Sequence, residues 1–301
     1  ELFPDDFKKI RAAFGIGEAE YYAVLGLQKN RVESGYSVVG SAEASGRSHS
    51  FFFLSADQQY ILKSCTKQDV ATLTRILGSF REHVTSCKSG AGGNSSLLPR
   101  YIGLYKLVSD DSTFPNATMV VMTNFFAGAY EIHHKYDLKG STYKRFASEK
   151  ERSKRSPVYK DLDWMGEGRR ITFLSVEEVK SIRQRLVKDT RYLSEQGLID
   201  YSLLVGVHNL KKGSIKTDKI GSNAEEREKR EPMRVITVKC TEGIYYLGIV
   251  DILTPFKLSK KAETLFSGIL ACRQNISCQP PSKYHKRFIS FCENEIFTSK
   301  A

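Results

Sequence analysis

A helix that ends at a glycine leads directly into an acidic residue and an apolar strand, and this succession constrains the fold more than any other feature. Ser175 and Glu178 have the spacing of a capping box, and apolar residues then recur on one helical face as far as Gly197. Asp200 follows, and Leu203 to His208 is a short apolar run typical of a buried strand. A carboxylate at such a junction tends to be held rigidly at the mouth of a cleft. For a single residue of this kind, however, a turn-capping role is the commoner interpretation.

The rest of the pattern is strands with one helix before residue 124, and helices with short strands after it. The predicted elements are a helix over 3–15, a hairpin over 36–63, a helix around 70–77, strands over 101–108 and 119–123, a hairpin over 234–252 and a helix around 284–292. We therefore expect an α+β fold with two lobes, residues 1–124 and 125–301, and a cleft between them.

Two charged stretches interrupt this pattern. Residues 144–170 contain nine Lys or Arg against five acidic residues, which predicts a solvated insertion. Residues 209–234 are charged without periodicity, which predicts a mobile loop.

The charge balance limits the class of partner. The chain has 301 residues, 41% of them hydrophobic, and a formal net charge of +12. A core of good size is therefore available, and the basic surface favours a nucleic acid, an anionic membrane or a phosphorylated substrate. The six cysteines lack C-x-x-C spacing, so we expect reduced thiols, and no segment approaches the roughly 20 apolar residues of a membrane span.

Three residues occur in the order that phosphoryl transfer requires. Lys63 ends an apolar strand, Asp200 follows the long helix, and Asp251 ends the strand 246–250. A kinase needs a lysine on the ATP phosphates, an aspartate for the attacking hydroxyl and an aspartate for Mg²⁺. Asp69 opens the helix after Lys63 and is a candidate ion-pair partner for it. The H-R-D and D-F-G motifs are absent, which excludes an ordinary protein kinase.

Two turns are candidates for phosphate binding. Residues 45–50, with Gly46, Ser48 and Ser50, form a small-residue loop before an apolar strand, although an ordinary hairpin turn explains them as well. Lys139-Gly140-Ser141-Thr142 offers a cation, hydroxyl groups and flexible backbone, with a plain β-turn as the alternative.

Three runs taken together resemble the phosphatidylinositol phosphate kinases. They are Tyr136–Thr142 (YDLKGST), Ile199–Gly206 (IDYSLLVG) and Gly248–Leu253 (GIVDIL), and the co-linear resemblance extends from Phe7 to Phe297. It implies a two-lobed fold that is distantly similar to protein kinases, with ATP bound between the lobes. It also implies a lipid kinase that uses ATP and Mg²⁺ to phosphorylate a phosphatidylinositol monophosphate.

The resemblance implies a role for each candidate residue. Lys63 would contact the ATP phosphates with Asp69 as its helix partner, and Lys139 would bind phosphate near the transfer site. Asp200 would be the catalytic aspartate and Asp251 the Mg²⁺ ligand. Gly46, Ser48 and Ser50 would belong to the equivalent of the glycine-rich loop, where Arg47 and His49 depart from the family pattern.

The segment 254–282 resembles the activation loop of the family, which selects the substrate and touches the membrane. Lys260 and Lys261 match its paired lysines, and such cations are attracted to an anionic leaflet. Glu263 stands where enzymes that phosphorylate the 5-hydroxyl of the 4-phosphate lipid have Glu and those that phosphorylate the 4-hydroxyl of the 5-phosphate lipid have Ala. Much of the remaining chain is similar to the second type. We expect phosphatidylinositol 4,5-bisphosphate as the product in either case, and favour the 4-phosphate lipid as the substrate.

These interpretations predict a cytoplasmic protein, peripheral at the cytosolic face of membranes, whose partners are an anionic phosphoinositide surface and, in a homodimer, a second copy of the chain. Two other classes compete with it. A catalytically idle phosphoinositide-binding module need not keep Lys63, Asp200 and Asp251 together. A nucleic-acid binder is suggested by charge alone, without a recognition motif.

Overall fold

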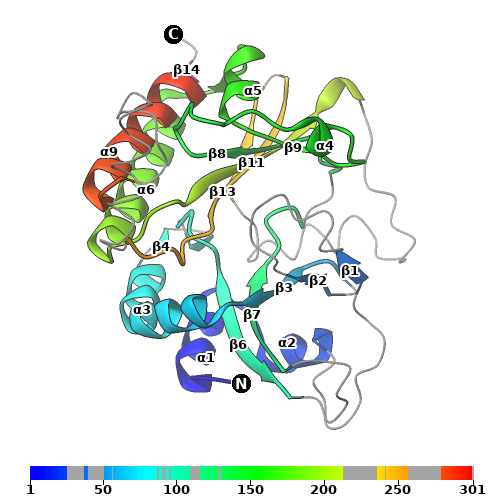
Figure 1. Ribbon diagram of the computed structural model, residues 1–301, viewed down its shortest axis with the longest axis vertical. Coiled ribbons are helices and arrows are strands. Elements are labelled where there is room, and N and C mark those ends of the chain that lie inside the picture. Colours follow the sequence, from blue (N-terminus) through cyan, green and yellow to red (C-terminus); the bar gives the residue numbers. More distant parts are fainter. Residues whose placement is uncertain are drawn as a thin grey trace. The chain divides into compact units, whose positions relative to one another are not determined.

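The computed structural model describes residues 1–25, 37–39, 51–55, 57–86, 88–89, 93–94, 96–108, 116–127, 130–212, 236–240, 242–256 and 279–299. The chain divides into two compact units (Figure 1). The first comprises Glu1–Ser95, Pro99–Gly128 and Ile220–Arg234, and the second comprises Ser96–Leu98, Ala129–Lys219 and Val235–Ala301. Each unit combines helices with a five-stranded sheet, so the predicted α+β class is confirmed.

The first unit is built on a sheet with the strand order β1-β2-β3-β7-β6. All of its neighbouring strands are antiparallel, and α1 contacts both β6 and α3. Its elements are α1 (Pro4–Ala13), α2 (Glu18–Val24), β1 (Ser37–Val39), β2 (Phe52–Leu54), β3 (Tyr60–Cys65), α3 (Lys67–Ser86), β4 (Lys88–Ser89), β5 (Gly93–Asn94), β6 (Tyr101–Leu107) and β7 (Ala117–Thr123). The predicted helix over 3–15, the hairpin within 36–63 and the helix around 70–77 are confirmed.

A buried arginine fastens the N-terminal helix of this unit. The Arg11 side chain is almost fully buried and forms ion pairs with Glu1, at 2.7 Å, and with Glu18, at 2.6 Å. It also donates a hydrogen bond to the carbonyl oxygen of Ile102 in β6. A buried cation needs such partners, so Arg11 joins α1, α2 and the sheet.

The second unit is built on a sheet with the order β12-β13-β11-β8-β9 and a small parallel sheet of β10 and β14. The helix α6 contacts α9, and the two lie side by side in Figure 1. The elements are β8 (His134–Leu138), α4 (Glu149–Arg152), β9 (Val158–Tyr159), α5 (Asp161–Gly166), β10 (Ile171–Phe173), α6 (Val176–Glu195), β11 (Ser202–Asn209), the 3₁₀ helix η1 (Leu210–Lys212), β12 (Ile236–Lys239), β13 (Gly243–Val250), α9 (Pro281–Phe291), the π-helix η3 (Cys292–Ile296) and β14 (Phe297–Ser299).

Several sequence predictions for this unit are confirmed. The side chain of Ser175 caps α6 by accepting a hydrogen bond from the amide of Glu178, and Gly197 has a left-handed φ of 69° just after the helix. The hairpin pairs β12 with β13 around residues 240–242, and α9 is the expected C-terminal helix.

The prediction that residues 144–170 form a solvated insertion is wrong. The stretch contains α4, β9 and α5, and Asp161, Asp163 and Trp164 are buried. Acidic and basic side chains of this stretch form ion pairs with each other in the folded unit, as Arg145 does with Asp161. The number of charged residues along the sequence does not show which of them pair. Of the predicted loop at 209–234, residues 213–234 lie outside the described residues.

Candidate active site

One antiparallel strand pair brings two aspartates to the same end of the second sheet. Ser202 at the start of β11 pairs with Val250 at the end of β13, so Asp200 and Asp251 both lie just beyond the paired segment. The segment before β11 and the segment after β13 pair again beyond the two aspartates. There the amide of Ile199 donates to the carbonyl oxygen of Thr254, and Leu198 forms a bridge with Pro255. The two carboxylates therefore stand at a local interruption of a ladder that is fixed on both sides.

The backbone at both aspartates is left-handed. The φ angle is 65° at Asp200 and 60° at Asp251, a region that non-glycine residues seldom adopt and that Asp and Asn tolerate better than most. Ile199, Tyr201 and Ile252 beside them are almost fully buried, whereas Asp251 is exposed and Asp200 is partly exposed. Buried apolar neighbours thus hold a conformation that turns two acidic side chains out of the core.

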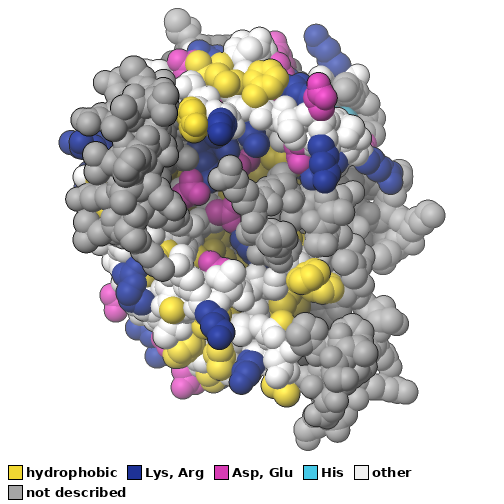
Figure 2. Space-filling model, viewed as in Figure 1, with side chains coloured by type: hydrophobic (Ala, Val, Ile, Leu, Met, Phe, Trp, Pro, Cys, Tyr) yellow, Lys and Arg dark blue, Asp and Glu magenta, His cyan; other side chains and the backbone are white. Residues whose placement is uncertain are grey.

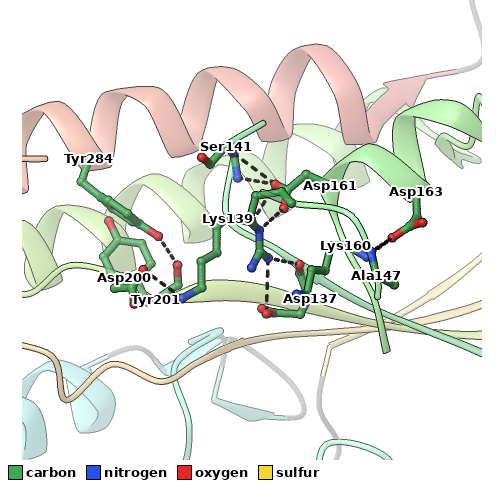
Figure 3. A network of polar contacts seen from close by, with 12 residues as sticks. Asp137, Lys139, Ser141, Ala147, Lys160, Asp161, Asp163, Asp200, Tyr201 and Tyr284 are labelled. Atoms are coloured by element: carbon green, nitrogen blue, oxygen red, sulfur yellow. Dashed lines mark hydrogen bonds and ion pairs between the residues drawn. The ribbon is translucent and has the colours of Figure 1, made fainter. Parts of the chain in front are cut away.

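Lys139 pairs with the first of these aspartates. It directly follows β8, whose Leu138 is paired with Leu203 of β11, and its Nζ lies 2.9 Å from Oδ1 of Asp200 (Figure 3). The side chain of Lys139 is 14% exposed and that of Asp200 is 40% exposed. The ion pair is shielded on the lysine side and open to solvent on the aspartate side, which leaves Asp200 accessible to a substrate.

The turn that carries Lys139 is tied to a buried carboxylate. The amides of Lys139, Gly140 and Ser141 donate to Oδ1 of Asp161 over 2.9, 2.7 and 3.2 Å (Figure 3). Gly140 has a φ of 65°, and a Cβ atom there would lie 3.0 Å from Cβ of Phe291 in α9, so this position requires glycine. The backbone amides of the turn are therefore occupied within the protein, and the side chain of Lys139 is what the turn presents outward.

Arg145 completes this polar cluster. Its Nε donates to Oδ2 of Asp161 over 2.7 Å, and its Nη2 donates to the carbonyl oxygen of Asp137 over 2.5 Å. Burial raises the pKa of the Asp161 carboxyl, while the charge of Arg145 and the donated hydrogen bonds act in the opposite direction.

A tyrosine from α9 supports the other side of the site. The hydroxyl of Tyr284 donates to the carbonyl oxygen of Tyr201, next to Asp200 (Figure 3). The two rings also meet edge to face at 4.7 Å, and Tyr284 is fully buried. Burial raises the pKa of Tyr284 well above its usual value, so its hydroxyl stays protonated as a donor.

The sequence is similar to known proteins over nearly all of this fold. A family model described as "Phosphatidylinositol-4-phosphate 5-Kinase" matches residues 34–295. The chain belongs to this family. Relatives of this phosphatidylinositol phosphate kinase include the rat "Phosphatidylinositol 5-phosphate 4-kinase type-2 beta", 29% identical over 98% of the chain and 76% of the relative. The pig type-2 alpha enzyme is 28% identical over 97% and 76%, and the human type-2 gamma enzyme is 28% identical over 98% and 75%.

Membership confirms the predicted class of activity, that of a lipid kinase with a phosphatidylinositol phosphate as substrate. Of the predicted site residues, the structure brings Lys139 and Asp200 into contact and places Asp251 at the same sheet end. It also shows polar residues that the sequence analysis missed: Asp161, Arg145 and Tyr284. The first two lie in a charged stretch where nothing distinguished them, and Tyr284 lies in the helix predicted around 284–292, for which the sequence indicated no role in the site.

Two further residues predicted for this kinase lie in the first unit. Lys63 is half-buried in β3, with its Nζ 5.5 Å from the centre of the Phe52 ring. Asp69 lies in the first turn of α3, and its carboxylate accepts hydrogen bonds from the amide of Thr66, at 2.9 Å, and from the hydroxyl of Thr66, at 2.8 Å. The predicted pairing of Asp69 with Lys63 stays a prediction.

The remaining predicted residues of the kinase lie outside the described residues. They are Gly46, Ser48 and Ser50 of the phosphate loop, with Arg47 and His49 beside them, and Lys260, Lys261 and Glu263 of the loop 254–282. Their roles stay predictions from the sequence.

Proposed function

We propose that this kinase transfers the γ-phosphate of ATP to a phosphatidylinositol monophosphate and forms phosphatidylinositol 4,5-bisphosphate. The observation that carries this proposal is the Lys139–Asp200 ion pair beside Asp251, at one end of the β11–β13 pair. Phosphoryl transfer requires a carboxylate for the attacking hydroxyl, a cation for the developing charge and an oxygen ligand for a metal ion, and these three residues supply that set.

Asp200 accepts the hydrogen bond of the attacking inositol hydroxyl and orients it for in-line transfer. Its partial exposure and fixed backbone suit this role, because an attacking group has to be held within a narrow range of positions. Lys139 holds the carboxylate in place through their ion pair and offsets negative charge as the phosphoryl group moves. No covalent intermediate with the enzyme is needed.

The donor set fits Mg²⁺ better than a softer metal. Asp251 offers a carboxylate that is exposed at the strand end, and Mg²⁺ in kinases is held by one or two carboxylates together with substrate phosphates. A dense protein cage is not expected for such an ion, and the described residues contain no group of three or more His, Cys, Asp or Glu side chains that could form one. Asp251 would hold the ion, which would neutralise phosphate charge during transfer.

For ATP we propose the arrangement that the resemblance implies, with the nucleotide between an N-terminal lobe of residues 1–124 and a C-terminal lobe of residues 125–301. Lys63 then contacts the α- and β-phosphates with Asp69 as its partner. The loop with Gly46, Ser48 and Ser50 covers the phosphates. What supports Lys63 is its place on a central strand of the first sheet, between β2 and β7.

The lipid substrate is either phosphatidylinositol 4-phosphate or phosphatidylinositol 5-phosphate. Glu263 favours phosphatidylinositol 4-phosphate, whereas the relatives reported above are 5-phosphate 4-kinases and favour the 5-phosphate lipid. We favour the first, because Glu263 lies in the segment that resembles the specificity loop. The test is a paired assay on both lipids with the regiochemistry of the product determined. Absence of phosphate transfer to either lipid would contradict the proposed function.

Replacing Glu263 with alanine should move the preference toward the 5-phosphate lipid. The glutamate would repel a phosphate on the wrong side of the inositol ring, and alanine removes that repulsion. The measurement is the ratio of kcat/KM for the two lipids, with Lys260→Ala as a control that should lower both values together. An unchanged ratio would rule out a specificity role for Glu263.

We also propose that the kinase works at an anionic membrane surface, on the cytosolic side. Two exposed aromatic residues close to the Lys139 turn support this: Tyr143 is 42% exposed and Phe146 is 55% exposed. A basic side chain lies over each ring. Nζ of Lys144 is 5.3 Å from the centre of the Tyr143 ring, and Cζ of Arg152 is 4.5 Å from the centre of the Phe146 ring. In Figure 2, hydrophobic side chains lie beside basic and acidic ones along the upper edge, over the second unit. Aromatic and basic side chains side by side are typical of membrane interfaces.

This aromatic–basic patch, formed by Tyr143, Lys144, Phe146 and Arg152, predicts how binding to vesicles should change. Tyr143→Ser with Phe146→Ser should weaken binding to vesicles with anionic lipid by about tenfold or more, since apolar area no longer leaves water. The matched control is Leu174→Ser with Val176→Ser, two exposed apolar residues elsewhere in the same unit. Equal binding of both double variants in a sedimentation assay would contradict the assignment.

The described residues contain no helix long and apolar enough to cross a membrane. Association of two copies in a homodimer is part of the proposal and is tested by measuring the mass in solution.

A further inference from the structure

The Lys139 turn has the geometry of an anion-binding nest. Its three consecutive amides point at one oxygen, Oδ1 of Asp161, over 2.7–3.2 Å. Successive amides that converge in this way form a cavity for an anion, which in other proteins is often a phosphate. In this chain the anion is a side chain of the protein itself, supplied by the first residue of α5.

The other oxygen of this carboxylate is also engaged. Oδ2 of Asp161 accepts a hydrogen bond from Arg145, and Arg145 reaches on to the carbonyl oxygen of Asp137, two residues before Lys139. Asp161 is fully buried, so the carboxylate that accepts the hydrogen bonds of the turn and of Arg145 is itself shielded from bulk water, in surroundings where polar contacts hold their geometry most firmly. The chain on both sides of Lys139 is thus fixed to a single buried group.

This arrangement determines where the ammonium group of Lys139 can lie. The turn sets the start of the side chain, and the 2.9 Å contact with Asp200 sets its end. We propose that Asp161 is a positioning residue for phosphoryl transfer, which occupies the nest of the Lys139 turn and thereby holds Lys139 against Asp200. The proposal rests on the proposed function, since it assumes that Lys139 acts on the transferred phosphoryl group.

Asp163 provides a matched comparison within the same helix. It is also buried, accepts hydrogen bonds from the amides of Ala147 and Lys160, each over 2.9 Å, and pairs with Arg152. Its chemistry is therefore that of Asp161, a carboxylate that joins backbone amides to an arginine. Figure 3 shows both residues, and Asp163 binds amides outside the Lys139 turn. A structural role alone would make the two residues equivalent.

The test compares Asp161→Asn with Asp163→Asn in the intact chain, with rates on phosphatidylinositol monophosphate vesicles normalised to folded protein. We expect Asp161→Asn to lose about 10- to 100-fold in kcat, on the scale of a displaced reacting group, with the KM for ATP nearly unchanged. Asp163→Asn should keep the wild-type kcat. Loss of activity in both variants to the same extent, or in neither, would overturn the proposal.

A second variant keeps the test decisive if Asp161→Asn does not fold. Gly140→Ala displaces the same turn through its contact with Phe291 while leaving Asp161 in place, and should give the same selective loss of kcat. Retention of kcat in Gly140→Ala would then overturn the proposal.

Amide hydrogen exchange provides a readout that does not depend on activity. It should accelerate over residues 139–141 in Asp161→Asn and near Ala147 in Asp163→Asn. Suppose that the wild type transfers no phosphate while the amides of residues 139–141 still exchange faster in Asp161→Asn than in the wild type. That result would contradict the proposed function but would support the binding of these amides by Asp161. Equal protection of residues 139–141 in Asp161→Asn and in the wild type would contradict the proposal that Asp161 holds the Lys139 turn.

Discussion

Replacing Asp200 with asparagine should lower kcat by at least about 100-fold, the usual scale for a positioned acid–base group. Asparagine keeps the size of the side chain and tolerates the left-handed backbone of this position, where φ is 65°. What it removes is the negative charge that accepts the hydrogen bond of the attacking hydroxyl and pairs with Lys139. The loss should therefore appear in kcat while the fold is retained, and steady-state kinetics with circular dichroism would measure both.

The partner of Asp200 provides the control. If the two side chains act as a unit, the double variant Asp200→Asn with Lys139→Met should lose little more than Asp200→Asn alone. Independent roles would instead multiply the two losses. Turnover near that of the wild type in Asp200→Asn would mean that another group orients the hydroxyl, and the assignment of the site would be wrong.

Replacing Trp164 with alanine should lower the free energy of unfolding by about 3–5 kcal/mol, the range for large aromatic residues removed from a core. Trp164 is fully buried in α5, its Nε1 donates to the carbonyl oxygen of Glu295 over 2.9 Å, and its ring meets Tyr136 edge to face at 4.9 Å. It thus joins three segments of the second unit: α5, β8 and η3. Alanine would leave a cavity and an unpaired carbonyl group.

Met165 is the neighbouring control for this prediction, because it lies on the same helix but is exposed. Met165→Ala should change the free energy of unfolding by no more than about 0.5 kcal/mol. Urea unfolding followed by circular dichroism measures both variants, since Trp164 is the only tryptophan in the sequence and its fluorescence disappears with it. A loss in Trp164→Ala as small as that of the control would mean that α5 is not part of the core.

The elements that the sequence predicted well were those with local signals. The helix α6 carries its own cap at Ser175 and its own stop at Gly197, and the strands β11 and β13 are apolar runs long enough to be buried. The segment 144–170 was predicted to be a solvated insertion because so many of its residues are acidic or basic. Their pairing, as between Arg152 and Asp163, depends on a chain path that no local pattern encodes.

The candidate site was predictable to a similar degree. Asp200 and Asp251 could be chosen because each adjoins an apolar strand, and Lys139 because it stands in a turn with glycine. The partner of that turn could not be chosen. Asp161 lies 22 residues beyond Lys139 among other acidic residues, and only the fold shows which of them is buried against the turn.

The left-handed backbone at Asp200 and Asp251 has a consequence for how this chain balances folding against chemistry. Glycine pays no steric penalty in this conformation, whereas an aspartate does. A chain selected only to fold well would therefore gain by losing both carboxylates, and each acidic side chain here is a small, permanent cost in stability. A screen for thermostable variants of this chain that does not also demand turnover has no reason to keep these two aspartates and would accept inert protein.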